Sequence, residues 1–115
     1  MLNIPVIRWG EEYDSLDKQE VLHFATGEAI ANVSQANGGI IQRDLRKAGK
    51  AREILKQFSI AQLIEMVGKA GEFFVDATLP LGDGEQSPQD FIHQQSASTG
   101  LPEHMVELGM SKNSF

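Results

Sequence analysis

The sequence has no cysteine, and this absence removes several kinds of chemistry at once. Without a thiol there is no disulfide, no thiolate nucleophile and no thiolate-bound metal in these 115 residues. No apolar run approaches the roughly 20 residues that a membrane-spanning helix needs, so no membrane partner is expected. The chain also lacks a basic segment followed by an apolar one at its start, so the cytoplasm is the expected location.

Basic residues are fewer than acidic ones, 10 against 16, so the net charge is −6. This negative charge argues against a nucleic-acid-binding protein. The exception is the segment Arg43–Lys56, which contains six basic and two acidic residues. A base-stacking surface would require aromatic residues among the basic ones, and this segment contains none. We therefore expect the solvated side of a helix here, rather than a phosphate-binding patch.

The remaining composition, 41% hydrophobic and 23% charged, is that of a folded chain, and the length allows a single region, 1–115. Two amphipathic helices are predicted at its centre, over 40–57 and 60–78, because apolar residues recur there every three or four positions. Ser59 separates them and is expected to cap the second helix, with Gln62 completing a capping box.

Short strands are predicted before these helices and further helices after them. Residues 3–9, 19–24 and 29–35 read as strands, the last two forming a β-hairpin, so that the hairpin region covers 3–36. Residues 11–15 read as an exposed connection and 79–85 as a loop. Ser87-Pro88 is typical of a helix start, which predicts helices over 88–99 and 102–109. The expected fold class is α+β.

A search for chemistry assigns no catalytic, cofactor-binding or metal-binding residue. The three histidines are far apart in sequence, and none has a second ligand at helical or strand spacing. The Gly-Lys pairs at 49–50 and 68–69 lack the remaining residues of a phosphate-binding loop. Among the carboxylates, nothing favours any one pair as acid and base.

Arg52 breaks the pattern of its helix, because it falls within the apolar stripe, and Asp44 lies close to the same stripe. A buried guanidinium needs partners for its five N–H donors. Three interpretations stay open: Arg52 extends to solvent from the stripe edge, forms a structural ion pair, or contacts a segment outside this chain.

From about residue 4 to 102 the chain resembles the N-terminal part of aldehyde dehydrogenases, as an outlying branch. The segment Thr26–Ala36 looks like their Thr-Gly-Glu hairpin and the strand after it. Ala51-Arg52 and Phe58-Ser59 resemble landmarks of their first helix, 59–74 resembles the second, and Ser98–Pro102 the Thr-Gly-Lys-Pro after the third. Departures are His23-Phe24-Ala25 in place of Asn-Pro, a missing Trp at the end of the first helix, and a longer loop over 81–89.

This resemblance implies a fragment of an α/β cofactor-binding domain, whose parent oxidises an aldehyde to a carboxylic acid with NAD or NADP. The family's catalytic and nucleotide-binding residues all lie downstream of the matched segment, so this chain alone is expected to bind no cofactor and to be inactive. Its expected partner is the rest of that domain, with a homo-oligomer possible. The alternatives are a free-standing α+β interaction module and the N-terminal part of a coenzyme-A-acylating aldehyde dehydrogenase.

One physical consequence follows from the fragment interpretation. The predicted strands are short, yet the two long helices present about a dozen apolar residues on their stripes. A parallel sheet with helices on its faces would cover such stripes. We therefore expect an apolar surface that the chain itself does not cover.

Overall fold

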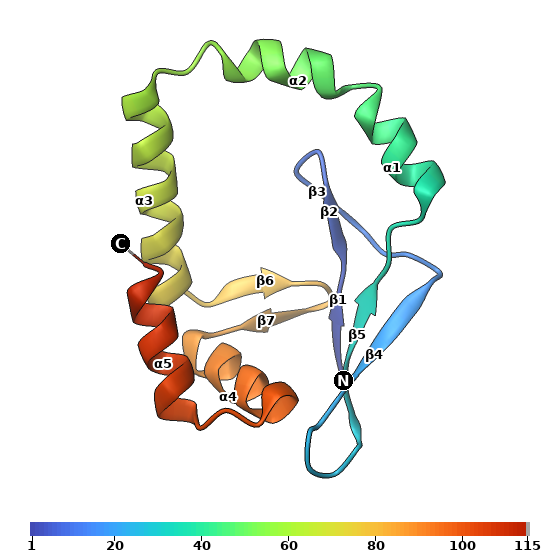
Figure 1. Cartoon of the computed structure of the whole chain (residues 1–115), viewed down its shortest axis with the longest axis vertical. Helices are drawn as coiled ribbons and strands as arrows, with labels where there is room; N and C mark the ends of the chain where they lie inside the picture. Colours follow the sequence, from blue (N-terminus) through green and yellow to red (C-terminus); the bar gives the residue numbers. More distant parts are fainter. Residues whose placement is uncertain (115) are drawn as a thin grey trace.

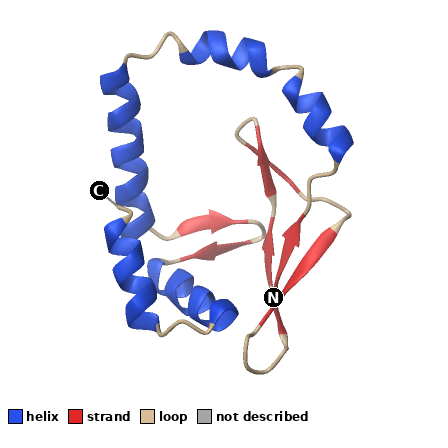
Figure 2. Ribbon diagram, in the orientation of Figure 1, coloured by secondary structure: helices blue, strands red, loops and turns tan. Residues whose placement is uncertain are grey.

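A computed structural model describes residues 1–114 and shows a mixed α+β chain, which confirms the predicted fold class (Figures 1 and 2). Seven strands form three small sheets: β1 (Leu2–Ile4), β2 (Val6–Arg8), β3 (Glu11–Tyr13), β4 (Lys18–Leu22), β5 (Ala29–Ser34), β6 (Leu79–Leu81) and β7 (Gly84–Gln86). The helices are α1 (Gly38–Leu45), α2 (Ala48–Leu55), α3 (Ile60–Asp76), α4 (Pro88–Thr99) and α5 (Glu103–Lys112).

The predicted hairpin is confirmed as β4 paired antiparallel with β5, with Val21 opposite Ala31. The first predicted strand is interrupted at Pro5, which cannot donate a ladder hydrogen bond, so β1 and β2 are separate. β1 lies parallel to the other edge of β5, with Leu2 opposite Ala31, which gives the sheet order β1-β5-β4.

Two predicted connections are wrong, because both contain strands. Residues 11–15 include β3, which pairs with β2 across a two-residue turn where Trp9 has φ 54° and Gly10 has φ 81°. Residues 79–85 contain most of the β6–β7 hairpin, whose turn begins at Gly82 with φ 58°. In both turns, positive φ angles give the backbone twist that a two-residue hairpin needs.

The single helix predicted over 40–57 is also wrong, since it divides into α1 and α2 at Arg46-Lys47. The helix predicted over 60–78 is α3, whose Ser59 and Gln62 form the expected capping box. The helix over 88–99 is confirmed as α4, and α5 begins one residue after the predicted start at 102 and extends three residues beyond 109. Among residues 1–114, no helix combines the length and apolar character needed to cross a membrane.

The buried core is small and is centred on α4, which packs against α5 on one side and against β7 on another. Its buried hydrophobic side chains are Ala31, Ile92, Ala97 and Met110. Phe74 and Phe91 join α3 to α4 through an edge-to-face contact with ring centroids 5.0 Å apart. Helices α1, α2 and α3 run around the strands in an arc that leads away from this core and back to it (Figure 1). We call these three helices the helix arc.

Candidate functional site

The helix arc is the part of the molecule with the most uncovered apolar surface. From Ile41 to Ala70, every residue is exposed except Asp44, Ala51 and Leu63. Nine large hydrophobic side chains of the arc are exposed, as is Phe58 in the connection from α2 to α3; the nine are Ile41, Leu45, Ile54, Leu55, Ile60, Ile64, Met66, Val67 and Phe73. Ile60, Ile64 and Val67 keep between 67% and 77% of their surface in solvent. Of the stripes that the sequence predicts, Ile41, Leu45, Leu55, Ile60, Ile64 and Val67 are therefore uncovered, whereas the end of the α3 stripe is partly covered, with Phe74 against Phe91 and Gly71 close to Ser114.

The dimensions of the whole molecule also indicate that it exposes more surface than a compact monomer does. Its accessible surface is 8619 Å², whereas a compact monomer of this mass exposes about 6,200 Å². The radius of gyration is 16.7 Å, against about 13 Å for a compact domain of this length. The surplus of about 2,400 Å² is larger than one side of a standard protein interface. This surplus belongs to the whole molecule, and it is the exposed hydrophobic side chains of α1, α2 and α3 that make the arc a candidate docking face.

One end of the arc is attached to the β2–β3 hairpin by a pair of charged hydrogen bonds. The Nε and Nη2 atoms of Arg8 donate to the two carboxylate oxygens of Asp44, each at 2.7 Å. Around this pair, the guanidinium of Arg8 lies 4.9 Å from the Tyr13 ring centroid and the ammonium of Lys47 lies 5.9 Å from that of Trp9. We call these five residues the hairpin clamp.

The electrostatics of the clamp follow from this geometry. The hydrogen bonds from Arg8 lower the pKa of Asp44 to about 2, with smaller contributions from Trp9 and Lys47. The same pairing raises the pKa of Arg8 above its ordinary value. Both groups are therefore charged across the physiological pH range, and the hairpin is held to α1 by a bidentate pair.

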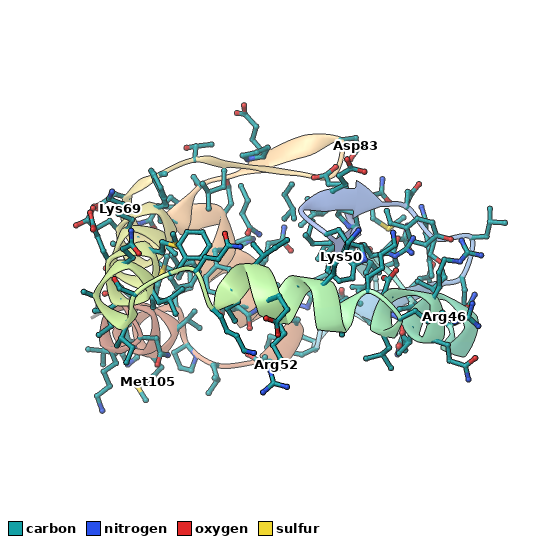
Figure 3. All side chains as sticks on the ribbon, turned by 90° about the horizontal axis from the view of Figure 1, so that it is seen from above. Arg46, Lys50, Arg52, Lys69, Asp83 and Met105 are labelled. Carbon is teal, nitrogen blue, oxygen red and sulfur yellow. The ribbon has the colours of Figure 1, made fainter. Side chains whose placement is uncertain are left out.

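The structure places the two residues singled out from sequence in different surroundings. Asp44 is partly buried and bonded to Arg8. Arg52 is exposed on α2, and none of the ion pairs among residues 1–114 includes it. Figure 3 shows Arg52 projecting from α2 away from the strands. Ala48 and Leu55, the apolar neighbours of Arg52, are also exposed. Within residues 1–114, no other segment therefore packs on Arg52 and these two neighbours.

Sequence reasoning missed Arg8, Trp9, Tyr13 and Lys47 as members of one cluster. A signal was present, because Trp9-Gly10 lies between two short β-forming segments at the spacing of a two-residue hairpin turn. Treating the acidic residues after Gly10 as a second strand would have brought Tyr13 opposite Val6. No pattern in the sequence indicated the contact between Arg8 and Asp44 of α1, which are 36 residues apart.

Two of the three histidines, His23 and His93, make contacts near them in sequence. The Nδ1 atom of His23 accepts from the backbone N–H of Ala25 at 3.1 Å, within the turn before β5. The Nδ1 atom of His93 lies 3.0 Å from the carboxylate of Glu103, both exposed. Within residues 1–114, no group of three or more histidine or carboxylate side chains could hold a metal ion.

A dinucleotide phosphate does not fit the strand-to-helix turn that leads from β5 into α1. Gly38 and Gly39 open the helix, but they are adjacent, so the Gly-x-Gly spacing of the dinucleotide fingerprint is absent, as is its third glycine. The side chain of Asn37 already accepts from the backbone N–H of Ile40 at 2.9 Å. The helix start is thus capped by its own chain, and no step through NAD or NADP is assigned to these residues.

A groove of about 450 Å³ separates the three-stranded sheet from α4. Aliphatic side chains of the sheet, such as Ile4 and Val33, form one wall, and Gln94, Gln95 and Ser98 of α4 form part of the other. The groove lies directly above buried Ala31 and is open to solvent. Its walls carry no charged side chain, so it offers no acid–base chemistry.

The chain was compared with protein-family models, with curated proteins and with solved structures, and none of them matches it.

Proposed function

We propose that this chain is the N-terminal part of an NAD(P)-dependent aldehyde dehydrogenase, built to pack on the cofactor-binding sheet of its parent protein. The observation that carries the proposal is the helix arc, whose apolar faces are exposed from Ile41 onward. A parallel sheet buries both of its faces under helices. The helices of the arc have apolar faces but no sheet to cover them, so they would suit the helix layer of such a sheet.

The placement of the segments that carry the resemblance supports the same proposal. Gly27 of the Thr-Gly-Glu turn and Gly100 of the Thr-Gly segment both have positive φ, 71° and 79°. Phe24 joins the two regions: its N–H donates to the carbonyl oxygen of Ala97 at 2.8 Å, and its ring lies against Gly100. Segments about 70 residues apart in sequence thus pack as one unit, as parts of a shared domain do.

In the proposed reaction an aldehyde, water and NAD(P)⁺ give a carboxylic acid, NAD(P)H and a proton. The nucleophile, the general base and the nucleotide site belong to the remainder of the parent. The chain's own contribution is packing: its arc shields one side of the cofactor-binding sheet from water. The partner implied by this role is the remainder of the cofactor-binding domain.

The test has two arms. The reading frame after codon 115 is expected to encode a cysteine-containing nucleotide-binding domain. The protein made from the whole frame is expected to produce NADH or NADPH when given an aldehyde, while the purified 115-residue chain produces none. Activity that requires coenzyme A would instead assign the parent to the acylating branch. A stop codon together with a stable monomer would favour the free-standing interaction module and contradict the proposal.

A further inference from the structure

The groove between the three-stranded sheet and α4 is an uncovered feature that is separate from the helix arc. Its volume of about 450 Å³ lies within the range of about 300–1,000 Å³ that small-molecule sites occupy. Its walls come from β1, β4, β5, β6, β7 and α4, and among residues 1–114 none from α1, α2 or α3 lines it. Covering the arc, as the proposed function requires, therefore leaves the walls of the groove unchanged.

The two walls of the groove differ in polarity. The sheet wall is aliphatic, with Ile4 of β1 and Val33 of β5 among its side chains. A helix that packs directly on a sheet turns an apolar stripe towards it. The wall from α4 is instead mostly polar, and its members recur at steps of three and four on one helix face: Phe91, Gln94, Gln95 and Ser98. Hydrogen-bonding groups therefore stand opposite an aliphatic wall, with open space between them.

Three of the polar groups that line the groove are carboxamides, those of Gln86, Gln94 and Gln95. A carboxamide is both a hydrogen-bond donor and an acceptor, so its best complement is a second carboxamide, whereas an aldehyde or ester carbonyl only accepts. We propose that the groove binds a linear aliphatic chain that ends in an uncharged carboxamide. The aliphatic chain lies along the sheet wall, and its carboxamide pairs with the glutamines. This ligand site goes beyond the proposed function, which assigns nothing to the groove.

The length of the walls fits a chain of moderate size. From Phe91 to Ser98 the α4 wall extends about 10 Å along the helix axis, at about 1.5 Å per residue. From Ile30 to Val33 the β5 part of the sheet wall extends about 10 Å, at about 3.3 Å per residue. An extended octyl chain has the same length, so it would contact both walls along their whole run and remove apolar surface from water.

The electrostatics of the groove exclude an anionic head group. None of the described residues that line the groove is charged, so a carboxylate bound there would lose water without gaining an ion partner. A smaller hollow of about 210 Å³ adjoins the groove, because Leu2, Gln86 and Gln94 line both. Glu85 and Asp90 also line this hollow, and their carboxylates would repel an anion. An uncharged carboxamide meets neither obstacle.

The binding test uses octanamide as the probe and octanoate as its charged counterpart of equal chain length. Titration of the isotope-labelled 115-residue chain is followed by two-dimensional NMR of the backbone amides at neutral pH. Octanamide should shift the signals of groove residues such as Ala31, Val33 and Gln94, with a dissociation constant of about 1 mM or lower. Octanoate should bind at least about ten-fold more weakly.

A pair of variants on α4 tests the role of the glutamine amides. Gln94→Leu keeps the size of the side chain but removes its donors and acceptor, so it should weaken octanamide binding about five- to ten-fold. Gln89→Leu is the matched control, because Gln89 is exposed on the same helix and does not line the groove, and its affinity should equal that of the parent chain. Far-UV circular dichroism checks that both variants are folded, and the comparison of the two probes on the parent chain depends on neither variant.

Three results would overturn the proposal. They are equal affinities for octanamide and octanoate, no binding of octanamide, and octanamide shifts confined to residues of the arc such as Ile60 and Ile64. An equal loss of affinity in Gln94→Leu and Gln89→Leu would likewise reject the pairing with the groove glutamines. The measurement uses neither an aldehyde nor NAD(P), so a parent frame without dehydrogenase activity would contradict the proposed function and leave the groove ligand standing.

Discussion

Arg8 and Asp44 show how a single ion pair can position a whole element. The β2–β3 hairpin meets α1 through this pair, and both side chains are about one-fifth exposed. The bond is bidentate, and the planar guanidinium matches the carboxylate in a way that lysine could not. The hairpin therefore meets α1 in a defined geometry rather than through a loose apolar contact.

The clamp makes the docking of the hairpin dependent on pH. The pKa of Asp44 falls from 3.8 to about 2 on folding, so the pair stabilises the docked state above about pH 4 and loses this effect as the pH falls towards 2. Fluorescence of Trp9, the only tryptophan, should therefore change between these values. Asp44→Asn should show the undocked signal already at neutral pH, whereas Glu53→Gln should match the parent. Identical pH profiles for Asp44→Asn and the parent would contradict the clamp.

Gly82 is a position where the neighbouring backbone leaves no room for a side chain. It has φ 58°, and a Cβ atom there would overlap the carbonyl oxygen of Asn3. Gly82→Ala should therefore lower the free energy of unfolding by about 1–3 kcal/mol. The same change at Gly49, in open space within α2, should raise it by about 0.5–1 kcal/mol. Urea unfolding of both variants provides the check, and equal effects would show that the Asn3 contact carries no energy.

At the scale of elements, α3 owes its start to local chemistry. The hydroxyl of Ser59 accepts from the backbone N–H of Gln62 at 3.1 Å, and the Gln62 side chain accepts from the N–H of Ser59 at 2.8 Å. Ser59→Ala should destabilise the first turn by about 1 kcal/mol. Amide hydrogen exchange at Gln62 and Leu63 should quicken accordingly, while Ser111→Ala, at an exposed position within α5, should leave these amides unchanged. Unchanged exchange in Ser59→Ala would mean that tertiary contacts hold the turn.

The elements also show what sequence patterns could and could not predict. Caps and apolar spacing are local, so α3, α4 and the β4–β5 hairpin were predictable from residues such as Ser59 and Ser87. The β6–β7 hairpin was missed because Gly82, Asp83 and Gly84 read as a plain loop between unpatterned residues. The break between α1 and α2 lies beside Asp44 and Lys47, where the clamp attaches, and that contact depends on a hairpin far away in sequence.

The candidate site was predictable only in outline. Helical periodicity indicated which side chains of α1–α3 share a face, and the shortness of the strands indicated that little would cover them. The partner of Asp44 was not predictable, because its pairing with Arg8 requires the fold of both segments. The stripe position of Arg52 could be read from sequence, whereas its projection into solvent could not.

At the scale of the whole molecule, uncovered apolar surface should be detectable with a hydrophobic dye. The purified chain should bind the dye, because the arc exposes large hydrophobic side chains such as Ile60 and Ile64. The Ile64→Asp variant should bind less dye than the parent chain, because it places a charge on this exposed apolar face. A monomer with a cooperative melt and no dye binding would contradict the fragment interpretation and favour a free-standing module.

The meeting of Gly82 with Asn3 also has a consequence for the order of events in folding. Asn3 donates to the carboxylate of Asp83 across 80 residues of sequence, whereas each hairpin closes over a few. The entropy lost on closing a loop grows with its length, so we expect this contact to form after the hairpins and helices that it joins. Contacts that form late govern the rate of unfolding and leave the rate of folding almost unchanged. We therefore expect Gly82→Ala, at the tip of the β6–β7 hairpin, to raise the rate of unfolding and to leave the rate of folding almost unchanged, as stopped-flow measurements in urea would check.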